Sequence, residues 1–101
     1  MALGGLLLEE LTDEQRRELG IAEGQLALRA KHVGEFGPHA AAKRAGFKKE
    51  DVVIAFGGER GRMREGDLMR IGVQRFKVGE NIPVTVRRGN ETIELSIPMQ
   101  P

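Results

Sequence analysis

Hydrophobic positions along the chain predict a set of short strands. Residues 52–56 are an unbroken apolar run of strand length, which is typical of a strand buried on both faces. Residues 25–31 alternate, with Leu26, Leu28 and Ala30 on one side, and this pattern predicts a half-buried strand. Three further apolar or alternating segments are interpreted as strands: 6–8, 82–86 and 93–97. The last two are joined by Arg88-Gly89-Asn90 and predict a terminal hairpin.

Capping signals predict two early helices. Thr12 and Gln15 have capping-box spacing, and Gly20 is expected to end the helix that they begin. Pro38 and the alanines that follow it predict a second, short helix with small side chains. Gly46 is expected to end this helix in the left-handed conformation.

A third helix is predicted from Asp67, as its cap, to about Phe76, with Gly79 as its stop. At about 100° per residue it has two adjacent apolar stripes. One stripe is Met69, Val73 and Phe76, and the other is Leu68, Ile71, Gly72 and Arg75. One stripe is enough to dock a helix on a sheet. Because the second contains a glycine and an arginine, we expect it to line a groove; the alternative is a helix packed on two sides.

These elements predict one α+β domain, mainly β, over residues 1–101. The strands do not alternate with long helices, which argues against a doubly wound parallel sheet. A partly open antiparallel barrel of five to six strands, capped by two to three helices, fits the order of elements. The apolar start of the sequence leads us to expect that this domain is part of a longer protein.

Residues 37–58 resemble the core of a bacterial PDZ domain of the kind attached to high-temperature-requirement serine proteases, which are trypsin-like. The family pattern is a small-residue helix, Ala-Gly-apolar, a charged pair, Gly-Asp-Val-Ile and a glycine turn. Here it is Ala45-Gly46-Phe47, Lys48-Lys49, Glu50-Asp51-Val52-Val53 and Gly57-Gly58. Glu50 stands where the family usually has glycine, which bears on the geometry of that turn. With its flanking matches the resemblance covers nearly the whole chain.

The resemblance implies a PDZ-like barrel with the bacterial, circularly permuted strand order. The peptide-binding strand would be Leu6, Leu7 and Leu8, and the late helix would present Leu68, Ile71, Gly72 and Arg75 to the groove. Leu3, Gly4, Gly5 and Leu6 would form the carboxylate-binding loop, in which backbone N–H groups converge on a terminal carboxylate. Gly5 departs from the apolar residue expected there. One alternative is a frayed terminus at this place. Another is a rival loop at Leu19-Gly20-Ile21, but no strand follows this segment, so it is interpreted as a helix stop.

Composition and side-chain chemistry exclude several other functions. The net charge of +1 argues against a dedicated nucleic-acid binder, and no apolar run reaches the length of a membrane span. The chain has no cysteine, and its two histidines, His32 and His39, have no third ligand at metal-site spacing. Ser96, the only serine, lies on the polar side of a predicted strand, a poor place for a nucleophile. We therefore expect no catalytic residues, no metal and no cofactor.

The expected function is a non-catalytic PDZ module that recognises C-terminal or unfolded apolar peptide segments. It would regulate an attached serine protease or feed substrate to it, in the bacterial envelope or periplasm. Its expected partners are peptide or protein C-termini and the parent protease, not nucleic acid or a membrane interior. The alternative is a structural or interaction domain that packs on its parent chain or oligomerises. A third class is a regulatory part of an intramembrane or carboxyl-terminal-processing protease.

Overall fold

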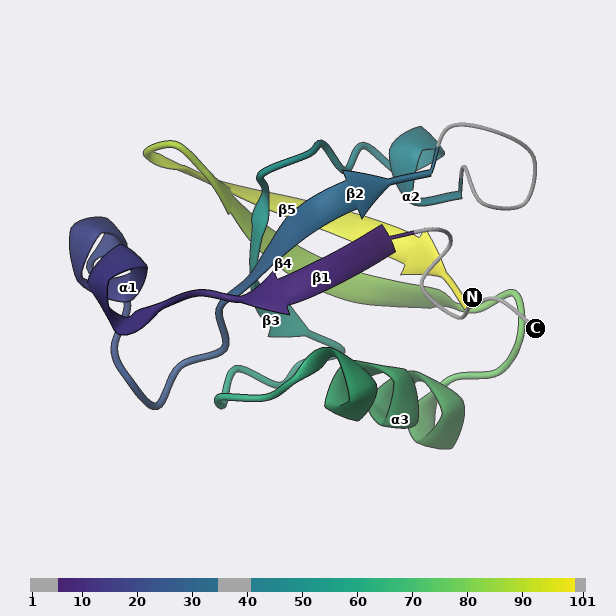
Figure 1. The fold of residues 1–101 in the computed structure, drawn as a ribbon. Helices are drawn as coiled ribbons and strands as arrows, with labels where there is room; N and C mark the ends of the chain where they lie inside the picture. The colour runs from purple at the N-terminus through teal and green to yellow at the C-terminus, as the bar shows by residue number, and fades with distance from the viewer. Residues whose placement is uncertain (1–5, 35–40, 100–101) are drawn as a thin grey trace.

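The computed structural model describes residues 6–34 and 41–99 of the 101-residue chain. The elements follow in the order β1 (Leu6–Glu10), α1 (Asp13–Leu19), β2 (Leu28–Val33), α2 (Ala41–Arg44), β3 (Val52–Phe56), α3 (Glu65–Arg75), β4 (Asn81–Arg88) and β5 (Glu91–Pro98). The strands form one open antiparallel sheet in the order β1-β2-β3-β4-β5 (Figure 1). This confirms the predicted α+β, mainly β class with five strands and three helices among the described residues.

β3 is the centre of the sheet and is buried along its whole length, as its apolar run predicts. Val53 and Phe56 belong to the main hydrophobic cluster, together with residues of β1, β2, β4, β5 and α3. Val52 and Ile54 belong to a second cluster with residues from the segments that flank α1. The strand therefore separates two cores, one on each face of the sheet.

β2 differs from its prediction at both ends. The strand begins at Leu28 rather than Gln25 and continues through Val33, where a loop was expected. Ala27, expected on the polar side, is 0% exposed and packs in the second cluster. The half-buried pattern is therefore wrong at this end, because the second cluster covers the face that the alternation assigned to solvent.

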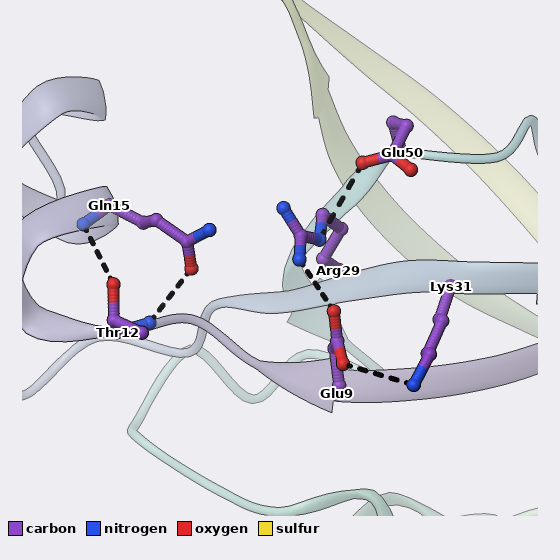
Figure 2. Close-up of polar contacts among 6 residues, drawn as sticks. All are labelled: Glu9, Thr12, Gln15, Arg29, Lys31 and Glu50. Carbon is purple, nitrogen blue, oxygen red and sulfur yellow. Dashed lines mark hydrogen bonds and ion pairs between the residues drawn. The ribbon is translucent and has the colours of Figure 1, made fainter.

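The predicted ends of α1 and α2 are confirmed where they fall within the described residues. The Gln15 N–H donates to Thr12 Oγ1 over 3.1 Å, and the Thr12 N–H donates to Gln15 Oε1 over 2.9 Å (Figure 2). Gly20 ends α1 with a φ of 70°, and Gly46 follows α2 with a φ of 105°. Both glycines thus take the left-handed conformation that helix stops require. Pro38 and Ala40 lie outside the described residues.

The start predicted for α3 is wrong, and Gly79 is not its stop. The helix begins at Glu65 with Arg64 as its N-cap, and Asp67 is its third residue. The Asp67 carboxylate accepts the Arg64 N–H over 3.0 Å, as the acidic member of a capping box does. The helix ends at Arg75 with Phe76 as its C-cap, close to the predicted end, and Gly79 lies in the loop beyond it. The predicted start was wrong because arginine is not a typical N-cap residue.

A partly buried ion pair joins the turn before β3 to the β4–β5 hairpin. Asp51 is 1% exposed, and its two carboxylate oxygens accept from Nε and Nη2 of Arg88, each over 2.7 Å. The carboxylate also accepts the Lys48 N–H over 2.9 Å. Arg88 Nη2 in turn donates to the carbonyl of Gly46 over 2.9 Å. The hydrogen bond to Asp51 is the main reason why the pKa of Arg88 is raised.

Replacement of Asp51 by alanine is expected to lower the free energy of unfolding by about 3 kcal/mol, because it leaves a partly buried guanidinium and a backbone N–H without their acceptor. Asp67→Ala is the matched control, since Asp67 also bonds an arginine (Arg70, 2.8 Å) and a backbone N–H, but at the surface. The control should cost about 1 kcal/mol or less. Urea denaturation measures both values, and equal losses would contradict the anchoring role of Asp51.

Glu50, which stands where the family pattern has glycine, has the left-handed backbone conformation that favours glycine. It is the one non-glycine residue with positive φ, 78°, in the described part of the chain. Its N–H donates to the carbonyl of Ala30 over 2.8 Å, so the turn is held to β2. The departure from the pattern therefore leaves the turn intact and places a side chain in a strained backbone conformation.

Glu50→Gly is expected to raise the free energy of unfolding by about 0.5–1 kcal/mol, since relief of roughly 1–2 kcal/mol of left-handed strain exceeds the entropy cost of glycine. Lys49→Gly, at the neighbouring turn residue, removes no such strain and should be destabilising by about 0.5–1 kcal/mol. Thermal and urea unfolding of the two variants provide the comparison. Equal destabilisation by both changes would show that Glu50 is not strained.

Candidate functional site

β1 lies at one edge of the sheet and leaves one side unpaired by any strand in the described part of the chain. It pairs with β2 through Leu6↔Val33, Leu7↔His32 and Leu8↔Ala30. The register skips Lys31 opposite the Leu7–Leu8 step, which is a β-bulge. On its other side β1 faces α3, and the two elements run in opposite directions (Figure 1). An exposed strand edge beside a helix is the geometry in which an extended peptide can be added to a sheet.

One backbone group shows how this edge is oriented. The N–H of Leu8 donates to Oε2 of Glu65, the first residue of α3, over 2.5 Å. The Leu8 N–H therefore points away from β2 and toward α3. Because backbone groups alternate along an antiparallel strand, the N–H of Leu6 is expected to point toward the same edge. The predicted binding strand thus presents hydrogen-bond donors to the space beside α3.

Leu8 of β1 and Leu68 of α3 lie in the core rather than in an open groove. Both belong to the main hydrophobic cluster, and Leu68 is 0% exposed. Gly72 is also buried, and a Cβ atom there would lie 3.3 Å from Met99 Sδ. The expectation that Leu68 is partly exposed is wrong. The predicted groove stripe supplies part of the core instead, because one face of α3 must close the main cluster.

The other two residues of that stripe turn toward the end of β3. Arg75 forms an ion pair with Glu59 over 2.7 Å. Ile71 lies beside Gly57, where a Cβ atom would be 3.4 Å from Ile71 Cγ2. The structure therefore divides the stripe, with Leu68 and Gly72 in the core and Ile71 and Arg75 against the turn after β3.

Two predicted loops have different outcomes. Leu3, Gly4 and Gly5 lie outside the described residues, so the carboxylate-binding loop stays a prediction; for Leu6 the structure describes the backbone alone. In the rival segment, the Gly20 N–H donates to the carbonyls of Arg16 and Arg17 at the end of α1. The interpretation of Leu19-Gly20-Ile21 as a helix stop is confirmed.

Sequence reasoning missed Glu65. The predicted helix began at Asp67, so Glu65 was left outside it. Its contact with Leu8 joins residues 57 positions apart in the sequence. The available signal was the position of Asp67, because an acidic residue at the third helical position would have moved the start of the helix to Glu65.

Charged side chains of β1 and β2 form ion pairs between the two strands (Figure 2). Arg29 Nη2 donates to Glu9 Oε1 over 2.5 Å, and its Nε lies 3.6 Å from Glu50 Oε2. Lys31 lies 3.7 Å from the second oxygen of Glu9. The hydrogen bond from Arg29 is the main reason that the pKa of Glu9 is lowered, and the same bond raises the pKa of Arg29. Opposite charges thus hold β1 to β2 on the side away from α3.

Acid is expected to remove the contribution of Glu9 to stability. Because its pKa is lower in the folded than in the unfolded chain, this contribution is present above the ordinary value of 4.5 and disappears as pH falls through the folded value. Glu9→Gln should therefore reduce the urea midpoint at neutral pH, and this reduction should shrink as the pH is lowered below 4.5. Glu14→Gln, on α1, controls for the loss of one carboxylate. A difference between wild type and Glu9→Gln that does not change with pH would contradict this assignment.

The described residues show neither a helix that is long and apolar enough to cross a membrane nor a group of three acidic, histidine or cysteine side chains placed to bind a metal ion. The candidate site consists of the β1 edge and the first residue of α3, which are joined by the bond between the Leu8 N–H and Glu65.

The chain has the fold of a PDZ domain, in the form found in HtrA-type proteases. No protein-family model and no curated protein matches it. The assignment of the PDZ fold rests on solved structures. The HtrA-type protease AlgW with a tripeptide matches 95% of this chain with a TM-score of 0.72 and 24% sequence identity. A variant of AlgW with a decapeptide matches 95% with a TM-score of 0.74 and 23% identity.

The HtrA3 PDZ domain, solved with the phage-derived ligand FGRWV, matches 93% of this chain with a TM-score of 0.66 and 20% identity. This chain covers 80% of that domain, but 27% and 30% of the two AlgW chains. The similarity to the proteases is therefore confined to a PDZ-sized part of them.

Proposed function

We propose that this chain is a non-catalytic, peptide-binding PDZ module. Its ligand adds to the sheet as a further antiparallel strand beside β1, between β1 and α3. The observation that carries the proposal is the direction of the Leu8 N–H, which points out of the sheet and meets a carboxylate oxygen across the space beside α3. A donor in this position is equally suited to a peptide carbonyl. The peptides in the matched structures support the same role.

The ligand ends at the beginning of β1. An antiparallel ligand runs opposite to β1, so its last residue lies near Leu6 and its earlier residues lie near Leu8. Its terminal carboxylate meets the N–H groups of the Leu3-Gly4-Gly5-Leu6 segment, where glycines allow neighbouring N–H groups to converge. Its last side chain is apolar, in keeping with the expected recognition of apolar C-terminal segments. Main-chain hydrogen bonds supply affinity, and side-chain contacts supply selectivity.

The attachment to a protease is a proposal of a different kind. The two AlgW chains are HtrA-type proteases of which this domain would represent somewhat less than a third. We place the domain by analogy next to a serine protease in the bacterial envelope, where it regulates the enzyme or presents substrate to it. No cofactor is needed for this role, since the hydrogen bonds come from the backbone.

Loss of the ligand's terminal charge is expected to weaken binding by about tenfold or more, because charge-assisted hydrogen bonds contribute roughly 1.5–3 kcal/mol. Displayed pentapeptides with random C-termini are first selected for binding to this domain. The selected sequence is then synthesised as the free acid and as the C-terminal amide, and both are titrated by calorimetry. Equal affinities would reject the carboxylate loop and leave binding of internal segments.

Amide chemical-shift mapping of the same titration locates the ligand. Shifts clustered on β1 and α3 support the proposed groove. Shifts concentrated on the β4–β5 hairpin would instead favour a structural or interaction domain with a different contact surface.

A further inference from the structure

The donor that a peptide needs on β1 already has an acceptor within the domain. The Leu8 N–H and Glu65 Oε2 are 2.5 Å apart, and the bond is partly buried. Glu65 belongs to another element and reaches Leu8 across the space where the proposed ligand lies. The contact is therefore not part of the sheet; it links the two sides of the groove.

The position of Glu65 favours this contact. It is the first residue of α3, where the helix dipole stabilises a negative charge. The bulge in β2 lies directly beside Leu8, and bulges change the local twist of the strand that they accompany. The start of α3 and the bulge in β2 thus both lie next to the contact between the Glu65 carboxylate and the Leu8 N–H.

A docked peptide requires the same N–H. Hydrogen-bonding positions recur every two residues along both strands of an antiparallel pair. If the terminal carboxylate meets the N–H of Leu6, the carbonyl that meets the N–H of Leu8 belongs to the residue two positions before the ligand's last residue. One N–H has a single hydrogen to donate, so this carbonyl and the Glu65 carboxylate exclude each other.

We propose that Glu65 is a built-in competitor for the peptide-binding edge: its carboxylate occupies the main-chain position of a ligand, and binding requires its displacement. This inference rests on the proposed function, because it concerns the regulation of the same site. It differs from a side-chain specificity pocket, since the competition concerns a backbone donor. Glu65 therefore lowers the affinity of every peptide that extends as far as Leu8, whatever its side chains.

Glu65→Ala tests the proposal in two measurements. In the free domain, loss of the short bond should shift the Leu8 amide proton upfield and speed its exchange with solvent. The selected pentapeptide acid should then bind the variant about tenfold more tightly than wild type, since a charge-assisted bond no longer has to be broken. Glu65→Gln keeps the size of the side chain and an acceptor oxygen, so it should give an intermediate gain.

Glu14→Ala is the matched control, because it removes a glutamate from the first turn of α1 and leaves β1 unchanged. It should alter neither the Leu8 amide nor peptide affinity. An unshifted Leu8 amide in Glu65→Ala would overturn the proposal, as would peptide affinities for wild type and Glu65→Ala that are equal. In the second case the proposed function stands, because both proteins still bind. Binding to neither protein would overturn the proposed function and this inference together.

Discussion

The buried carboxylate of Asp51 holds the arrangement on which the rest of the fold depends. It lies one residue before β3 and accepts hydrogen bonds from the turn behind it and from Arg88 on the hairpin. A buried charge is tolerated only when its partners are in place, so the bonds fix how β3 meets β4. Both hydrophobic clusters contain residues of β3. The hydrogen bonds of one acidic side chain thus help to position the strand that both cores share.

The strands of the sheet are held by fewer contacts at the candidate site than next to Asp51. β3 is paired on both sides and buried on both faces, whereas β1 is joined to the sheet by β2 alone. Besides this strand pairing, three side-chain contacts hold β1 in place. Leu8 packs in the main cluster, Glu9 forms an ion pair with Arg29, and Glu65 accepts the Leu8 N–H. Binding sites commonly lie in such less constrained regions, because a ligand must be able to displace what is there. The proposed binding groove lies at this less constrained edge of the sheet.

The sequence predicted those features whose signals are local. The run 52–56, the capping box at Thr12 and the stops at Gly20 and Gly46 each depend on a few neighbouring residues, and all were confirmed. Periodicity showed that α3 has two apolar stripes, but it could not show which neighbour each stripe contacts. Leu68 was therefore assigned to the groove although it lies in the core. The start of α3 was missed because Arg64 is an unusual cap, and with it the pairing of Glu65 with Leu8 was missed too.

The Glu65 contact also addresses a difficulty that a peptide-binding edge creates for the free protein. An unpaired strand edge can pair with other strands, and proteins commonly protect such edges with charge. The carboxylate of Glu65 satisfies the outward N–H of Leu8 and places a negative charge where another strand would approach. If displacing it costs a ligand about tenfold in affinity, roughly one molecule in ten has the edge open at any time. Protection of the edge and competition with ligands are then the same interaction, so neither can be strengthened without strengthening the other.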